Sequence, residues 1–131
     1  MAKRQNQEFH DQVCQLVAKK RFPYPSEDHP TWKTYVNEPD SQMCFKDGKF
    51  CPDIVVVDAD NRAPVIGEIE TDDTVNSESA DQWKDYSVLA DLYLYVPVGF
   101  GDQAKKLAGN IKIIGFREYE VEEGKIQITN V

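Results

Sequence analysis

Two carboxylates lie two residues apart in VIGEIE, residues 65–70, which is otherwise apolar and precedes the polar residues TDDTV. Side chains of a strand alternate between its two faces, so Glu68 and Glu70 share one face with Ile66. A charge this close to a core has to be offset, usually by a metal ion, a cation or hydrogen-bond donors. These residues therefore mark a candidate site for chemistry.

Asp53 is the second part of this candidate site, because it directly precedes the apolar run Ile54–Val57. The β-branched side chains of this run predict a central strand that is buried on both faces. Opposing side chains of adjacent antiparallel strands lie about 5 Å apart, so Asp53 and Glu68 could share one divalent cation. Their oxygens suit a hard ion such as Mg²⁺.

Gln82 and Tyr86 are candidates for contact with a substrate. They stand four residues apart in a predicted helix and therefore share one of its faces. A glutamine amide and a tyrosine hydroxyl in these positions can place a phosphate, a base or an attacking water. Ordinary core packing of Tyr86 is the competing interpretation.

The first helix is predicted over residues 5–20, and Pro23 prevents it from continuing. Its apolar side chains recur at helical spacing, namely Phe9, Val13, Leu16 and Val17. Residues 22–40 hold four of the seven prolines and are predicted as a loop, part of which packs through its aromatic residues.

The remaining residues alternate between strand and helix patterns. A turn at Asp47-Gly48 is predicted to join the first two strands, and a serine to cap the second helix. Strands are predicted at residues 41–45, 51–59, 63–71, 92–98 and 110–116, helices at 77–91 and 101–109, and a terminal hairpin about Glu123-Gly124. This order predicts an α/β fold, with a mixed central sheet flanked by helices, in one domain of residues 1–131.

Three motifs stand in order on two successive strands and the helix after them: Pro52-Asp53, Glu68-Ile69-Glu70 and Gln82-x-x-x-Tyr86. Together they resemble the PD-(D/E)XK nuclease superfamily, whose restriction endonuclease-like core has the order α-β-β-β-α-β. The Gln-x-x-x-Tyr is similar to that of the RecB-like branch. The resemblance covers roughly residues 5–115 and is strongest between Pro52 and Tyr86.

The resemblance implies a metal-dependent nuclease that hydrolyses DNA phosphodiester bonds with Mg²⁺ or Mn²⁺ as its cofactor. It implies that Asp53 and Glu68 are metal ligands and catalytic residues, with the Ile69 carbonyl as a third ligand. It also implies that Gln82 and Tyr86 bind the substrate.

Glu70 departs from the family pattern, which has a lysine at this position. An ionised glutamate cannot stabilise developing negative charge as that lysine does. Three explanations stay open. In the first, Glu70 acts as a catalytic base or an extra metal contact. In the second, a lysine from elsewhere, Lys46 or Lys49 rather than Lys84, supplies the missing positive charge. In the third, the site is inactive and the protein binds nucleic acid or a protein partner.

Glu8, on the first helix, is a further candidate metal ligand, because family members often place a glutamate there. A solvated position on the helix surface is the alternative. His10 and His29 form no recognisable pair and receive no role. The three cysteines lack the spacing of a zinc site, and Cys44 and Cys51 are expected to be free thiols although they flank one hairpin.

A formal net charge of −8 argues against non-specific coating of nucleic acid. A few basic residues, or a partner subunit, can still supply contacts to the phosphates of a DNA substrate. No stretch reads as a membrane span or a signal peptide, and the sparse cysteines are typical of a reduced, cytoplasmic protein. The small size leaves room for a homodimer or a larger assembly.

Overall fold

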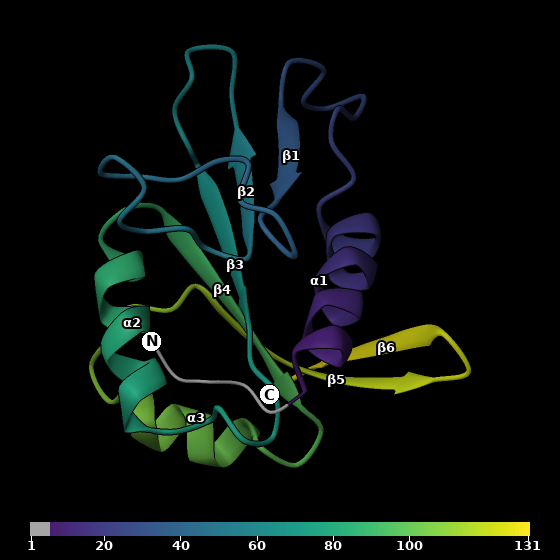
Figure 1. The fold of residues 1–131 in the computed structure, drawn as a ribbon, viewed down its shortest axis with the longest axis vertical. Helices are drawn as coiled ribbons and strands as arrows, with labels where there is room; N and C mark the ends of the chain where they lie inside the picture. Colours follow the sequence, from purple (N-terminus) through teal and green to yellow (C-terminus); the bar gives the residue numbers. More distant parts are fainter. Residues whose placement is uncertain (1–5) are drawn as a thin grey trace.

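Helices and strands alternate along residues 6–131, the part of the chain that the computed structural model describes (Figure 1). The elements are α1 (Gln7–Arg21), β1 (Lys33–Val36), β2 (Ile54–Val57), β3 (Val65–Ile69), α2 (Ser77–Ser87), β4 (Asp91–Pro97), α3 (Gly101–Ala108), β5 (Gly115–Glu122) and β6 (Lys125–Asn130). This arrangement confirms the predicted α/β class.

The six strands form one sheet in the order β1-β2-β3-β4-β5-β6. The pairs β3–β4 and β4–β5 are parallel and the other three are antiparallel, so the sheet is mixed, as expected. A parallel pair needs a crossover connection, and α2 and α3 lie in these two connections.

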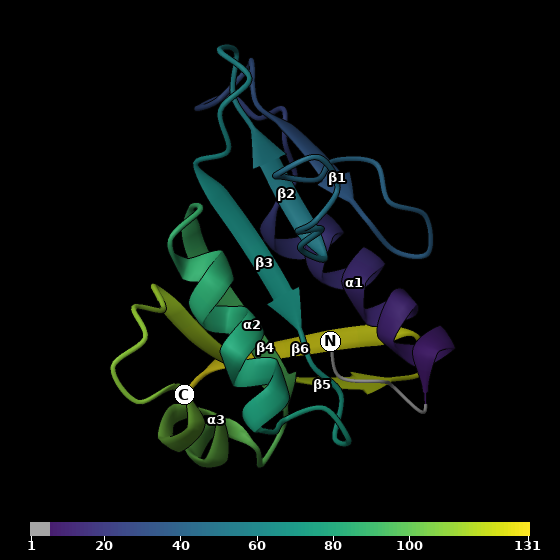
Figure 2. The same cartoon turned by 60° about the vertical axis from the view of Figure 1, so that its left-hand side comes forward.

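The strands bury alternate side chains in two separate cores. Ile54 and Val56 of β2 pack on the α1 side, whereas Val55 and Val57 pack on the side of α2 and α3. Figure 2 shows α1 on one side of the sheet and the other two helices opposite it. All four residues of β2 are buried, which confirms the prediction of a central strand.

Asparagine side chains cap the first two helices. The Asn6 side chain accepts a hydrogen bond from the backbone N–H of Phe9, and α1 ends one residue before Phe22. The α2 cap is Asn76, which accepts from the N–H of Ser79, so the prediction of a serine cap is wrong. An asparagine side chain offers the same acceptor at this position.

The first strand is the main error of the sequence-based prediction. Lys33–Val36, predicted as loop, pairs with β2, whereas residues 41–45 contribute only a single bridge between Phe45 and Phe50. Threonine, tyrosine and valine suit a strand, and the prolines of this region lie on either side of the segment. The predicted turn at Asp47-Gly48 does form, since both residues have positive φ.

The structure also tests the predictions for the Cys44–Cys51 pair and for the C-terminal hairpin. Cys44 and Cys51 form a disulfide, so the expectation of free thiols is wrong for this pair. The Phe45–Phe50 bridge closes a tight turn, and this brings the two flanking cysteines together. The hairpin about Glu123-Gly124 is confirmed between β5 and β6, but β5 starts at Gly115 instead of residue 110.

Within the described part of the chain, each helix is too short or too polar to cross a lipid bilayer.

Candidate functional site

Asp53 and Glu68 face each other at the end of the β2–β3 pair. The last paired residues are Ile54 and Gly67, so the residues that come next are opposed across the two strands. Beyond that pair, Asp53 Oδ2 accepts a hydrogen bond from the N–H of Ile69 at 2.8 Å. Glu68 Oε1 in turn accepts from the N–H of Asp53 at 2.9 Å. The two residues are therefore opposed across the strands, and the carboxylate of each accepts from a backbone N–H of the other strand.

Glu70 directly follows β3, which ends at Ile69, and is held by a different element. Its Oε2 accepts a hydrogen bond from Trp83 Nε1 of α2 at 2.8 Å, and its backbone carbonyl accepts from the Tyr119 hydroxyl at 2.6 Å. Asp53, Glu68 and Glu70 are only 3%, 2% and 1% exposed. Three carboxylates are thus buried within one short region, where donors or cations must offset their charge.

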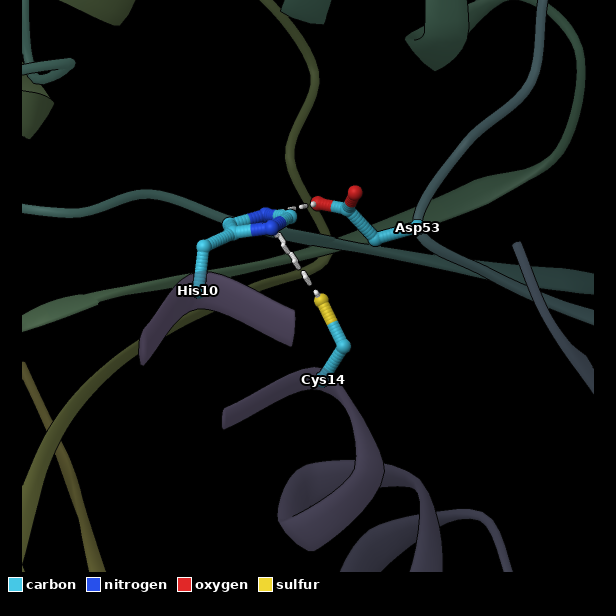
Figure 3. Close-up of side chains that lie close together, drawn as sticks. All are labelled: His10, Cys14 and Asp53. Carbon is cyan, nitrogen blue, oxygen red and sulfur yellow. Dashed lines mark hydrogen bonds and ion pairs between the residues drawn. The ribbon is translucent and has the colours of Figure 1, made fainter. Parts of the chain in front are cut away.

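His10 is the residue of α1 that reaches Asp53. Its Nε2 lies 3.3 Å from Asp53 Oδ2 and 3.1 Å from the carbonyl oxygen of Ile69. Cys14, one turn further along α1, places its Sγ 3.6 Å from the same nitrogen (Figure 3). Both side chains are fully buried. The imidazole therefore stands between the thiol and the carboxylate.

Sequence reasoning assigned no role to His10 or Cys14. The available signal was their four-residue spacing next to the apolar face of the first helix, which places two metal-ligating side chains on one side of a helix. A histidine and a cysteine on a buried helix face are also common in plain cores, so the spacing becomes informative only beside Asp53.

Metal-ligating groups cluster in two places among the described residues. His10, Cys14 and Asp53 form one group and His10, Asp11 and Glu38 the other, with donor atoms within 4.8 Å of one another in each. Glu68 and Glu70 belong to neither group. Glu8, the predicted ligand on α1, also belongs to neither and lies exposed on the helix surface.

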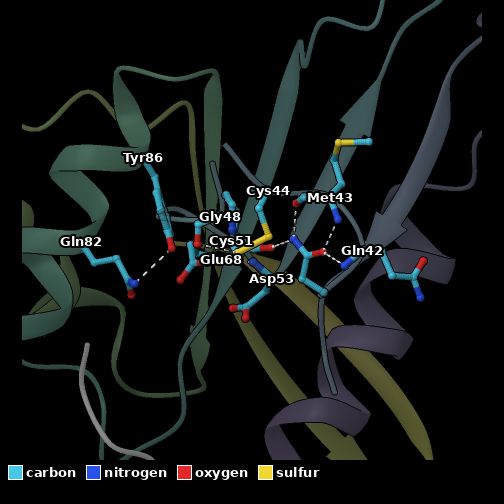
Figure 4. The surroundings of a disulfide bond; sticks show 11 residues. Gln42, Met43, Cys44, Gly48, Cys51, Asp53, Glu68, Gln82 and Tyr86 are labelled. Carbon is cyan, nitrogen blue, oxygen red and sulfur yellow. Dashed lines mark hydrogen bonds between the residues drawn. A yellow bond between two sulfur atoms is a disulfide. The ribbon is translucent and has the colours of Figure 1, made fainter. Parts of the chain in front are cut away.

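Gln82 and Tyr86 do share one face of α2. Gln82 Nε2 donates to the Tyr86 hydroxyl at 3.1 Å, and the Tyr86 ring packs edge-on against Phe50. Figure 4 shows both side chains pointing from α2 toward the strands that carry Asp53 and Glu68. Tyr86 is only 2% exposed and belongs to the core, and it also lines a cavity.

That cavity has a volume of about 550 Å³ and lies between α2 and the loop before β2. Its walls include Lys49 together with four carboxylates, which are Glu38, Glu78, Asp81 and Asp85. The disulfide residue Cys51 also borders it. Of the three lysines considered from the sequence, Lys49 is the one that lines this space, whereas Lys84 and Lys46 are exposed elsewhere. The cavity is therefore predominantly acidic.

Comparisons of this chain with protein-family models, with curated proteins and with solved structures find no match. The function is therefore inferred from the geometry of the site.

Proposed function

We propose that this protein is a metal-dependent nuclease of the PD-(D/E)XK type, with a restriction endonuclease-like core, that hydrolyses DNA phosphodiester bonds. The observation that carries the proposal is the pairing of the buried carboxylates of Asp53 and Glu68 across β2 and β3. The order α1-β1-β2-β3-α2-β4 and the position of Gln82 and Tyr86 on α2 support it.

The oxygen atoms near Asp53 are the donors for a divalent ion in this proposal. Asp53 Oδ2 and the Ile69 carbonyl oxygen lie 3.3 and 3.1 Å from the same atom, His10 Nε2, so an ion that binds both oxygens would displace the imidazole. Oxygen donors of this kind suit Mg²⁺ or Mn²⁺, and Glu68 adjoins them through the Asp53 backbone. When bound, such an ion polarises a phosphodiester and lowers the pKa of a coordinated water.

The chain's own residues would orient and assist this reaction. The hydrogen-bonded pair of Gln82 and Tyr86 borders the cavity and can hold a phosphate oxygen or a base. Glu70, fixed by Trp83, keeps a carboxylate close to Glu68 and can accept a proton from the attacking water. Lys49, on the cavity wall, is the cation that can take the place of the family's lysine.

The test is cleavage of single-stranded, duplex and branched DNA in Mg²⁺ or Mn²⁺. Glu68→Gln keeps the shape of the side chain and its acceptor for the Asp53 N–H, and we expect it to reduce cleavage by about 100-fold or more. Asp60→Asn, in the exposed turn between β2 and β3, is the matched control and should cleave normally. Metal-dependent cleavage that survives Glu68→Gln contradicts the proposal.

The acidic cavity favours a second function, that of a nuclease-fold protein that has lost its chemistry and binds a partner. Four carboxylates around the Gln82–Tyr86 pair repel DNA phosphates and attract a basic segment of a protein. In that case none of the DNA forms is cleaved, and a lysine-rich peptide binds in a strongly salt-dependent manner. Binding that persists after Asp81→Asn combined with Asp85→Asn contradicts this second function.

A further inference from the structure

We propose that His10, Cys14 and Asp53 form a binding site for a zinc-type transition-metal ion. This inference does not depend on nuclease activity, although it shares Asp53 with the proposed nuclease site. The three side chains come from α1 and from the residue before β2, and all three are buried. Their donor atoms lie within 4.8 Å of one another.

The distances match the edges of a coordination tetrahedron. Zinc bonds of about 2.0–2.3 Å place two tetrahedral ligands roughly 3.3–3.7 Å apart. His10 Nε2 lies 3.3 Å from Asp53 Oδ2 and 3.6 Å from Cys14 Sγ. The sulfur is also 3.8 Å from His10 Nδ1, so it does not lie along the lone pair of Nε2, and the imidazole has to turn before Nε2 and the sulfur can share one ion. The Ile69 carbonyl, 3.1 Å from Nε2, is available as a fourth ligand.

The surroundings of His10 prepare Nε2 for a metal ion. Asp11 Oδ1 lies 3.2 Å from Nδ1, and Gln7 Nε2 donates to the same carboxylate oxygen at 2.7 Å. A carboxylate at Nδ1 holds the proton there and leaves the lone pair of Nε2 for coordination, as at most histidine metal ligands. Gln7 Nε2 is also 3.3 Å from Nδ1, and the Ile69 carbonyl, which can only accept, lies 3.1 Å from Nε2, so both contacts suit the tautomer with its proton on Nε2. Metal binding therefore selects between two tautomers that the structure can accommodate.

The charges of the group also fit a divalent ion. A thiolate, a carboxylate and a neutral imidazole together carry two negative charges, which one divalent ion neutralises. Cys14 gives up its proton to solvent when the ion binds, so uptake should become weaker as the pH falls. A neutral centre is the arrangement that a fully buried position tolerates best. The sulfur and nitrogen donors favour Zn²⁺ over Mg²⁺.

The same geometry argues against a nucleophilic cysteine assisted by histidine and aspartate. In such a relay the nucleophile and the carboxylate contact opposite nitrogens of the imidazole. Here Cys14 Sγ lies 3.6 Å from Nε2 and 3.8 Å from Nδ1, so the thiol is aligned with neither nitrogen as a proton donor to a base would be. The thiol is also fully buried, which keeps a substrate away from it.

A single-thiol variant provides the sharpest test. Cys44→Ser combined with Cys51→Ser leaves Cys14 as the sole cysteine of the chain. We expect this protein to bind one equivalent of Co²⁺ with a thiolate-to-cobalt charge-transfer band, and one equivalent of Zn²⁺ by titration calorimetry. Zn²⁺ should raise its melting temperature by roughly 5–15 °C, whereas Mg²⁺ should not. Absence of the charge-transfer band overturns the inference, and this readout removes no ligand from the site.

Substitutions then assign the ligands. Cys14→Ala should abolish the band and the zinc-dependent rise in melting temperature, and Asp11→Asn should weaken zinc binding about 10–100-fold by releasing His10 Nδ1. Asp60→Asn, in the exposed turn between β2 and β3, is the matched control for Asp11→Asn and should bind Zn²⁺ as the parent does. Zinc binding that survives Cys14→Ala overturns the inference.

The outcomes separate this inference from the proposed nuclease activity. Zinc binding that requires Cys14, in a protein that cleaves no DNA, upholds the metal site and contradicts the nuclease. Cleavage that requires Glu68, in a protein that binds no zinc, upholds the nuclease and overturns the metal site.

Discussion

The side chains of Asp53 and Glu68 continue the β2–β3 ladder beyond its last backbone pair. Glu68 Oε1 accepts from the N–H of Asp53, and Asp53 Oδ2 accepts from the N–H of Ile69, at 2.9 and 2.8 Å. Each carboxylate thus replaces a backbone carbonyl that the partner strand no longer supplies. The two residues hold the strands together at the place where they form the candidate site.

Glu68 should contribute to stability as an acceptor. Glu68→Ala leaves the buried N–H of Asp53 without this partner, whereas Glu68→Gln keeps an oxygen in the same place. We expect the alanine variant to have a free energy of unfolding about 1–3 kcal/mol lower than the glutamine variant in urea titrations. Equal stabilities of the two variants would show that the bond contributes nothing.

The contact between Trp83 and Glu70 should couple α2 to β3. Trp83→Phe keeps an aromatic ring in the core but removes the N–H that donates to the buried Glu70 carboxylate. We expect a loss of about 1.5–3 kcal/mol in the free energy of unfolding. Trp32→Phe, in the half-buried cluster with Tyr24 and His29, is the control for the change of ring.

A double-mutant cycle isolates this bond from the packing of the ring. Trp83→Phe, Glu70→Met, which removes the acceptor oxygens, and the double variant should give a coupling energy of about 0.5–3 kcal/mol in urea unfolding. Additive effects of the two substitutions contradict a direct contribution of the hydrogen bond.

Asn37 should anchor the loop that carries the disulfide and borders the cavity. Its Nδ2 donates to the carbonyls of Met43 and Pro52 at 2.6 and 2.7 Å, and its Oδ1 accepts from the N–H groups of Gln42 and Met43 at 2.7 and 2.8 Å. Asn37→Asp turns the donor into an acceptor that faces two carbonyls, so we expect a loss of about 3 kcal/mol or more.

The exposed turn residue Asn61 provides the matched control for Asn37. Asn61→Asp makes the same chemical change at the surface and should alter the free energy of unfolding by less than about 0.5 kcal/mol. A similar small effect at both positions would mean that the Asn37 bonds do not hold the loop.

Tyr95 should make stability depend on pH in alkaline solution. Burial raises the pKa of its hydroxyl from 10.0 to about 12. The unfolded chain therefore releases this proton at a lower pH than the folded protein, so the stabilisation is complete below pH 10 and is lost as the pH rises toward 12. The slope from this group is at most about 1.4 kcal/mol per pH unit.

Tyr95→Phe isolates this effect from other groups that titrate in the same range. Chemical unfolding of both proteins across this alkaline interval should show a shallower decline for the phenylalanine variant. Parallel declines in the two proteins would assign the dependence to other groups.

Local patterns along the chain account for the confirmed parts of the fold. The β-branched run Ile54–Val57 is buried on both faces, and the alternation in β3 directs Ile66 into one core and Ile69 into the other. Strand periodicity depends only on neighbouring residues, so it is readable without knowledge of the rest of the chain. The pairing of Asp53 with Glu68 follows once β2 and β3 are adjacent.

The sequence-based prediction of the first strand was wrong because two segments of the chain could pair with the same edge of β2. Lys33–Val36 and residues 41–45 both lie before β2, and the sequence favoured the nearer segment because it flanks a strong turn signal. The edge of β2 accepts only one neighbour, and the more distant segment occupies it. The displaced residues 44–51 instead close on themselves through a disulfide.

The sequence by itself determined which residues alternate along β3, and therefore that Ile66 and Glu68 share one face beside a buried strand. Only the tertiary structure decided that the indole N–H of Trp83 donates to the Glu70 carboxylate, and that His10 and Cys14 lie beside Asp53. His10 and Asp53 are 43 residues apart, and their contact depends on how α1 packs across the sheet. Such packing is set by the shapes of whole elements, which no local pattern of residues records.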